Sequence, residues 1–128
     1  MKLLGIDFGT KNIGLAINNG TEIAFPFKSV KNDAKAVTEI KDACDEENID
    51  TIIIGRPTKM NRSAGVLEKE IKIFAEKIKG AASKPMEFED EILSSEQAKK
   101  MMADYSGKYD KDAIEAAVIL QSYLDKNV

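Results

Sequence analysis

Apolar residues in the first 27 positions fall into three short stretches, separated by turns rich in glycine and asparagine. This pattern predicts strands over residues 2–9, 12–17 and 22–27. The pair Asn19-Gly20, between the second and third stretches, is typical of a two-residue hairpin turn. We therefore expect the chain to open with an antiparallel meander.

The remainder of the chain alternates between helical and extended patterns. A wholly apolar, β-branched run at residues 51–55 predicts a central strand covered on both faces, and residues 85–89 predict a further strand. This order of elements predicts a single α/β domain over residues 1–128, with a mixed central sheet of about five strands and helices on both faces. The predicted helices cover residues 33–47, 66–80 and 94–104 and a segment that begins near residue 112.

The composition restricts the available chemistry. The 128 residues include no histidine and one cysteine, Cys44, which excludes a histidine general base and the usual structural zinc sites. The chemistry is therefore left to carboxylates, hydroxyls, lysines and arginines, and carboxylates favour hard cations such as Mg²⁺ or Mn²⁺. A lone cysteine in a helical pattern is typical of a reducing cytoplasm, and the apolar stretches are too short to span a membrane. We expect a cytoplasmic protein without a membrane partner.

Asp7 interrupts the first apolar strand and stands just before a Gly9-Thr10-Lys11 turn. A charge in such a strand is expensive to bury unless something compensates it, and a bound metal ion is one compensation. The glycine in the turn leaves room for a phosphate group. We expect a metal ligand at Asp7 and phosphate contacts from Thr10 and Lys11, whereas the simpler alternative is that Asp7 only begins the turn.

Further carboxylates are expected at the same edge of the sheet, because ligands of open α/β sheets bind outside the carboxyl ends of the parallel strands. Asp90 and Glu91 close the last predicted strand, and Asp112 stands at the start of the final helix. Together with Asp7 they suit two-metal hydrolysis of a phosphodiester. Simpler alternatives remain open. Asp90 and Glu91 are only the solvated end of an edge strand, or the run Glu87, Glu89, Asp90 and Glu91 is an acidic surface. Asp112 forms a helix-capping box with Glu115.

Both arginines of the chain lie in one loop. Arg56 and Arg62 fall within residues 55–65, together with Lys59. The net charge of −3 argues against a general nucleic-acid coat protein, but a local basic loop beside a carboxylate site is compatible with a nuclease. We expect Arg56, Lys59 and Arg62 to bind phosphates of a nucleic acid.

Four sequence blocks, taken in order, resemble the YqgF-type (RuvX-like) protein family. The first, GIDFGTKNIGLA at residues 5–16, is similar to the family's first-strand motif almost throughout. The others resemble its Gly-x-Pro loop, its Asp-Glu block and its closing Asp-containing helix. These three blocks are IGRPTKMNRSAG at residues 54–65, DEILSSEQA at residues 90–98 and DAIEAAVILQSYL at residues 112–124.

The resemblance implies an RNase H-like fold and a metal-dependent nuclease linked to maturation of precursor 16S ribosomal RNA. An older proposal for the family is cleavage of four-way DNA junctions. The resemblance assigns catalytic roles to Asp7, Glu91 and Asp112, and metal-ligand roles to these three residues and Asp90. It also favours Asp112 as a ligand over Asp112 as a helix cap alone. The implied cofactor is Mg²⁺ or Mn²⁺, and the implied partner is structured RNA or branched DNA.

One departure from the family pattern leaves other functions open. The family's arginine after the acidic pair is replaced by Ile92, which removes a cation from the expected site. A module that binds nucleic acid or a ribosome-maturation partner without cutting it is therefore an alternative. The segment DFGTKN at residues 7–12 also resembles the first phosphate motif of actin- and Hsp70-like ATPases, although no second copy of such a motif follows.

Overall fold

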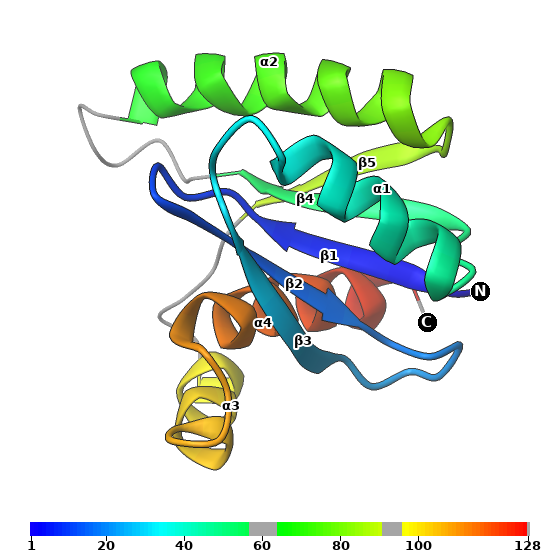
Figure 1. Cartoon of the computed structure of the whole chain (residues 1–128). Coiled ribbons are helices and arrows are strands. Elements are labelled where there is room, and N and C mark those ends of the chain that lie inside the picture. The colour runs from blue at the N-terminus through cyan, green and yellow to red at the C-terminus, as the bar shows by residue number, and fades with distance from the viewer. Residues whose placement is uncertain (57–63, 91–95, 128) are drawn as a thin grey trace.

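Five strands form one mixed sheet in the order β3-β2-β1-β4-β5 (Figure 1). The computed structural model describes residues 1–56, 64–90 and 96–127, and for residues 64–66 it describes the backbone alone. Strand β2 pairs antiparallel with both β1 and β3, whereas β4 pairs parallel with both β1 and β5. The strands are β1 (Leu3–Asp7), β2 (Asn12–Ile17), β3 (Phe25–Lys31), β4 (Thr51–Arg56) and β5 (Met86–Asp90).

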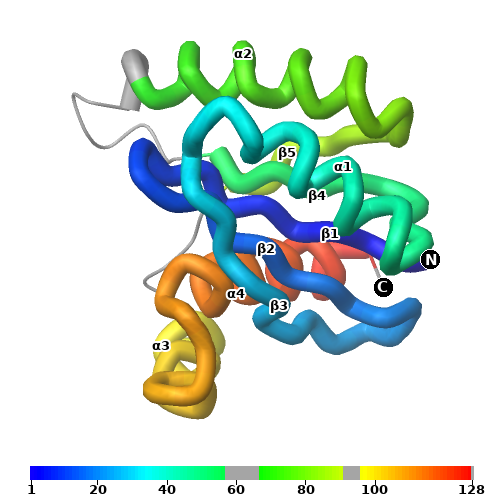
Figure 2. Tube along the Cα trace, in the orientation of Figure 1, coloured from blue at the N-terminus to red at the C-terminus, as the bar shows by residue number. Residues whose placement is uncertain are grey.

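Helices cover both faces of this sheet, as the order of elements predicted. Helices α1 (Ala36–Glu46) and α2 (Ala64–Ala82) lie over one face, and α4 (Lys111–Lys126) lies against the other (Figures 1 and 2). Helix α3 (Glu96–Tyr105) packs on α4 rather than on the sheet. None of the described helices is long and apolar enough to cross a lipid bilayer.

The two faces of the sheet differ in side-chain size. Along β1, Leu4 and Ile6 point into the large core beneath α1 and α2, as alternation along a strand requires. Gly5 lies on the α4 side, where a Cβ atom would come within 2.8 Å of Leu120 Cβ. On β4, a Cβ atom at Gly55 would come within 2.4 Å of Ile119 Cδ1. Helix α4 therefore lies close to the backbone of the central strands.

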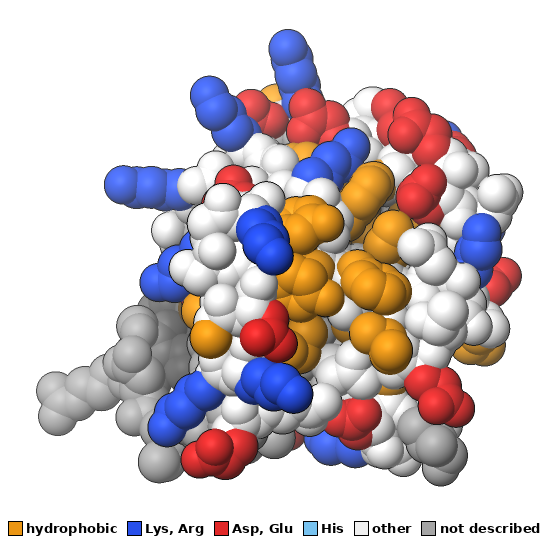
Figure 3. Space-filling view, turned by 90° about the horizontal axis from the view of Figure 1, so that it is seen from below, with side chains coloured by type: hydrophobic (Ala, Val, Ile, Leu, Met, Phe, Trp, Pro, Cys, Tyr) orange, Lys and Arg blue, Asp and Glu red, His pale blue; other side chains and the backbone are white. Residues whose placement is uncertain are grey.

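Hydrophobic side chains gather near the middle of the surface on the α3 and α4 side, with charged side chains around them (Figure 3). Met101, Tyr123 and Leu124 pack half-buried against the small core under α4. Glu87 accepts a hydrogen bond from the hydroxyl of Tyr123. This bond and burial raise the pKa of Tyr123 to about 12.

Element boundaries differ from the prediction mainly at the third strand, which was expected over residues 22–27. The hairpin turn is present, because Asn19 and Gly20 both have positive φ and the Thr21 N–H donates to the carbonyl of Asn18. The chain does not enter the ladder directly afterwards. The Thr21 hydroxyl bonds to nearby backbone, and the Ala24 N–H donates to the side chain of Gln121, 97 residues away. These bonds delay the start of β3 to Phe25.

The first two helices also differ slightly from the expected ranges. Helix α1 begins at Ala36 rather than near Asp33, because the Asp33 carboxylate accepts the N–H of Lys35 and holds a turn there. Helix α2 continues past Gly80 to Ala82. A Cβ atom at Gly80 would meet no neighbour, so this glycine is not required by packing.

Candidate active site

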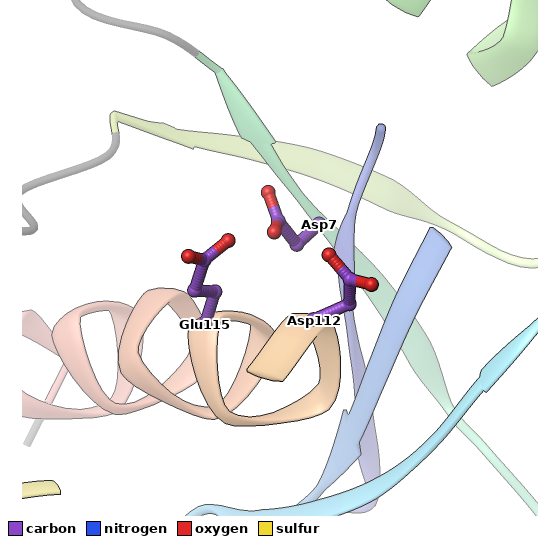
Figure 4. A group of neighbouring side chains, drawn as sticks. All are labelled: Asp7, Asp112 and Glu115. Atoms are coloured by element: carbon purple, nitrogen blue, oxygen red, sulfur yellow. The ribbon is translucent and has the colours of Figure 1, made fainter. Parts of the chain in front are cut away.

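Asp7 is the last residue of β1, and its side chain is only 9% exposed. Its neighbours along the strand, Ile6 and Phe8, belong to the core under α1 and α2. Asp7 therefore points to the opposite side of the sheet, towards the start of α4 (Figure 4). A carboxylate this deeply buried needs compensation for its lost hydration.

Two carboxylates from α4 lie beside Asp7. Asp112 and Glu115 are three residues apart, so they leave the helix from one face. Oxygen atoms of Asp7, Asp112 and Glu115 all lie within 4.8 Å of one another, and the three side chains point towards a shared space (Figure 4). Residues from β1 and the start of α4, more than 100 positions apart, thus form one acidic group.

The interpretation of Asp112 and Glu115 as a capping box is wrong. Helix α4 begins at Lys111 with Asp110 as its N-cap residue, so Asp112 already lies inside the helix. The Asp110 carboxylate accepts a hydrogen bond from the Ser29 hydroxyl on β3, at 2.6 Å. Glu115 was not predicted as a ligand. Its spacing from Asp112 was the available signal, but a capping box has the same spacing.

The acidic group carries electrostatic repulsion. Burial raises the pKa of Asp112, and the negative charges of Asp110 and Glu115 raise it further, while Lys111 acts in the opposite direction. Lys111 lies 4.0 Å from Glu115 and is largely exposed, so its compensation is weakened by solvent. A cation shared by the three carboxylates would remove this repulsion.

Asp90 and Arg56 occupy the ends of β5 and β4, where they are direct partners in the parallel ladder. The Arg56 Nε donates to Asp90 Oδ1 at 3.1 Å, and the guanidinium lies 5.7 Å from the centre of the Phe88 ring. Among the described residues, the acidic group consists of Asp7, Asp112 and Glu115, and Asp90 lies apart from it in this ion pair. The metal-ligand role of Asp90 stays a prediction.

Four further positions that the sequence singled out lie outside the described residues: Lys59, Arg62, Glu91 and Ile92.

Thr10 and Lys11 are exposed on the turn between β1 and β2. Asn32 braces this turn, because its side-chain amide donates to the carbonyl of Gly9 and its backbone N–H donates to that of Lys11. Thr10 also lines a cavity of about 370 Å³ between this turn and the two helices of the other face, together with Phe8, Asn32, Val37, Ile73 and Lys77. The phosphate-binding roles of Thr10 and Lys11 stay predictions.

Glu89 is buried, so the interpretation of Glu87, Glu89, Asp90 and Glu91 as an acidic surface is wrong for this residue. Its side chain is only 5% exposed. It accepts hydrogen bonds from the Ser122 hydroxyl at 2.8 Å and from Lys126 Nζ at 2.7 Å, both on α4. Glu89 therefore ties β5 to the far end of α4, and its charge is paired.

Comparison with known proteins places the chain in a family. The sequence matches the RuvX family, described as Holliday junction resolvase, over residues 1–126. This chain belongs to the RuvX family. Relatives from Clostridium acetobutylicum and Endomicrobium trichonymphae are 34% and 37% identical to it, and each carries the name "Putative pre-16S rRNA nuclease". The matches cover 98% of this chain and 98% of the first relative, and 97% and 95% for the second.

Solved structures with low sequence identity share the fold. T. thermophilus RuvC in complex with a Holliday junction substrate superposes with a TM-score of 0.69 at 12% identity, covering 95% of this chain and 92% of RuvC. The fowlpox virus resolvase bound to Holliday junction DNA gives a TM-score of 0.60 at 14% identity, covering 100% and 99%. At these identities the likeness is one of fold, and it confirms the RNase H-like fold expected for this member of the RuvX family.

Proposed function

We propose that this protein is a divalent-metal-dependent nuclease that hydrolyses phosphodiester bonds, with Asp7, Asp112 and Glu115 holding the cation. The observation that carries the proposal is the convergence of these three carboxylates from β1 and α4. Glu91, which falls in the Asp-Glu block, is proposed as a further catalytic carboxylate on the strength of the family pattern.

The donor set supports a hard cation. Carboxylate oxygens alone, without histidine or thiolate, favour Mg²⁺ or Mn²⁺ over zinc or copper. Asp7 is nearly buried, and Asp112 and Glu115 are partly buried, so their negative charges are poorly solvated. A cation that binds there replaces lost hydration and removes mutual repulsion, which makes the group a better metal site than three exposed carboxylates.

Asp7, Asp112 and Glu115 would hold a divalent ion, which would supply activation of a water molecule and stabilisation of charge on the scissile phosphate. The carboxylates of Asp7, Asp112 and Glu115 fix where that ion lies. Lys11 on the β1–β2 turn and Arg56 at the end of β4 supply positive charge for the phosphates of the bound strand. Thr10, Lys59 and Arg62 are proposed to add further phosphate contacts.

The proposed substrate is precursor 16S ribosomal RNA in the cytoplasm. Two relatives that match nearly the full length of this chain carry the name "Putative pre-16S rRNA nuclease", and this name supports the choice. Four-way DNA is the second candidate, and the description of the RuvX family supports it. Cleavage of either substrate breaks a phosphodiester bond, so the same acidic group would serve both.

The test compares cleavage of single-stranded RNA, structured precursor rRNA and a four-way DNA junction by the wild type and Asp7→Asn, with Mg²⁺ or Mn²⁺. We expect Asp7→Asn to lower the cleavage rate more than about 100-fold, because a central metal ligand is lost. The matched control is Asp45→Asn, which neutralises an exposed carboxylate on α1. It should cleave at the wild-type rate.

Two results would count against the proposal. Cleavage that persists in Asp7→Asn at the wild-type rate would place the chemistry elsewhere. RNA binding with strong salt dependence, but no cleavage with any divalent metal, would favour the non-cutting binding module. Among the substrates, the one cleaved fastest by the wild type decides between precursor rRNA and four-way DNA.

A further inference from the structure

One row of directly paired residues crosses three strands beside the acidic group. Asp7 on β1 is the ladder partner of Gly14 on β2, and Gly14 is the partner of Ser29 on β3. Each member of this row meets the start of α4. Asp7 shares the acidic group with Asp112, the backbone of Asp112 lies on Gly14, and Ser29 donates to Asp110.

We propose that Gly14 and Ser29 are positioning residues that hold the first turn of α4 where Asp112 and Glu115 share one divalent cation with Asp7. The inference rests on the proposed function, because it concerns the same acidic group. It adds that metal affinity depends on two residues that carry no ligand atom.

Gly14 allows the closest approach of α4 to the sheet. A Cβ atom there would lie 1.8 Å from the carbonyl oxygen of Asp112, 2.3 Å from its carbonyl carbon and 3.0 Å from the nitrogen of Ala113. All three atoms are backbone, so no rotamer change relieves the clash. Gly14 does not have a positive φ, so the contact with α4, rather than the local backbone conformation, requires glycine here.

A side chain at Gly14 must therefore push the first turn of α4 away from β2. Restoring an ordinary contact requires a shift of roughly 1 Å or more, since non-bonded carbon atoms pack at about 3.5–4.0 Å. Asp112 belongs to this turn and Glu115 follows it directly, so both carboxylates move with it, whereas Asp7 stays on β1. Misplacement on this scale lowers the efficiency of a site on the order of 100-fold.

Ser29 acts on the same turn from the next strand. Its hydroxyl donates to the carboxylate of Asp110, the N-cap residue of α4, at 2.6 Å. The bond is exposed, so its loss costs little folding stability. Its loss nevertheless frees Asp110, two residues before Asp112, from β3. Loss of a hydrogen bond that helps to position metal ligands typically changes metal affinity by about 10–100-fold.

The chain offers a matched control for each residue. Gly55 also lies under α4, where a Cβ atom would meet the side chain of Ile119, with Cδ1 at 2.4 Å, and this contact is about two turns beyond Asp112. Ser122 donates to Glu89 at 2.8 Å, which is likewise a hydroxyl-to-carboxylate bond between α4 and a strand, at the far end of the helix. Both controls disturb the packing of α4 without touching its first turn.

The experiment is a Mn²⁺ titration of the full chain, with free Mn²⁺ followed by electron paramagnetic resonance and folding checked by circular dichroism. The variants are Gly14→Ala, Ser29→Ala, the controls Gly55→Ala and Ser122→Ala, and Asp7→Asn. We expect Gly14→Ala to weaken Mn²⁺ binding at least about 10-fold and Ser29→Ala about 3–10-fold. Each control should stay within about twofold of the wild type when folded, because the first turn of α4 is undisturbed.

The outcomes separate this inference from the proposed function. If the wild type shows no Mn²⁺ binding that depends on Asp7, both are overturned. If it binds Mn²⁺ and the Gly14 and Ser29 variants match their controls, the positioning role alone is overturned. Should Gly14→Ala fail to fold, the comparison of Ser29→Ala with Ser122→Ala decides, since each removes one hydroxyl-to-carboxylate hydrogen bond at opposite ends of α4.

Discussion

Asp112 and Glu115 leave α4 three residues apart, and both carboxylates point towards Asp7 across the gap to β1 (Figure 4). The helix therefore contributes two oxygen donors from one turn, and the strand contributes one. A helix face delivers this pair with fixed spacing, because residues three apart are neighbours on its surface. Glu115 thus becomes a candidate ligand equal in position to the two aspartates.

The first prediction concerns Glu115→Gln. It should weaken Mn²⁺ binding about 10–100-fold and slow cleavage to a similar extent, because one of three donors loses its charge. Folding stability without metal should not fall, since the ion pair of Glu115 with Lys111 is long and exposed on the lysine side, and loss of the Glu115 charge relieves its repulsion with Asp112. Mn²⁺ titration, cleavage assays and thermal melts measure the three quantities.

Asp45→Asn is the control for this prediction. Asp45 forms an i,i+4 pair with Lys41 on α1, at 2.9 Å, and so resembles Glu115 in its local contacts. Metal binding by this variant should equal that of the wild type. Equal Mn²⁺ affinity in Glu115→Gln and Asp45→Asn would remove Glu115 from the site.

Much of this arrangement follows from local sequence, and the rest does not. The apolar run at residues 51–55 and the alternation around Asp7 are local signals, and they led to the mixed sheet and to Asp7 as a candidate. Glu115 was missed because its spacing from Asp112 fits both a cap and a ligand pair. The start of α4 at Lys111 excludes the cap, and the closeness of both carboxylates to Asp7, more than 100 residues away in the chain, favours the ligand pair.

The third strand was misplaced for a similar reason. Residues 22–24 have a strand-like pattern, but the side chain of Gln121 bonds to the Ala24 N–H and to the carbonyl of Glu22. These bonds occupy backbone groups that a hairpin ladder would otherwise use. Hydrogen bonds from a side chain about 97 residues away leave no signal in the local sequence. The start of β3 at Phe25 could therefore not be predicted from the pattern of apolar residues.

The second prediction is a pH-dependent gain in stability for Asp112→Asn in metal-free buffer. Burial and then the charges of Asp110 and Glu115 raise the pKa of Asp112, so the folded protein binds the proton more tightly than the unfolded chain. The charged form therefore destabilises the fold. This cost grows as the pH rises from the ordinary carboxyl pKa through the raised value.

Asp112→Asn removes that cost. Its melting temperature in EDTA should exceed that of the wild type at pH 7, and the difference should shrink near pH 3.5, where the wild-type carboxyl is also neutral. Added Mg²⁺ should raise the wild-type melting temperature more than that of the variant. A difference in EDTA that is equally large at both pH values would contradict the electrostatic origin.

The third prediction concerns Arg56→Ala. The variant should bind single-stranded RNA more weakly. The plot of log affinity against log salt concentration should become less steep by about one unit, the amount expected for the loss of one phosphate contact. Stability should change by no more than about 1 kcal/mol, because both Arg56 and its partner Asp90 are substantially exposed. Filter binding at several salt concentrations gives the slope.

Lys41→Ala is the matched control for Arg56. Lys41 has a similarly exposed side chain, at 44% against 41% for Arg56, and it also pairs with one aspartate. Because it lies on α1, its removal should leave the salt slope unchanged. The same reduction in slope for both variants would show that overall charge, rather than the position of Arg56, governs binding.

The fourth prediction uses Cys44 as an internal reporter of opening. Burial raises the pKa of this thiol to about 11, and the charge of Asp45 adds to the shift. At pH 8 the folded protein should therefore contain little thiolate, and Cys44, a residue only 1% exposed, should react with a disulfide reagent far more slowly than in the unfolded chain. Reaction then reports the fraction of molecules that have opened.

This reaction also tests metal binding without a nuclease assay. A ligand that binds only the folded state lowers the open fraction, so saturating Mg²⁺ should slow the labelling of Cys44 in the wild type. The slowing should be lost in Asp7→Asn, because the cation then has a weakened site. Equal protection by Mg²⁺ in both proteins would mean that the ion stabilises the fold at a place other than the acidic group of Asp7, Asp112 and Glu115.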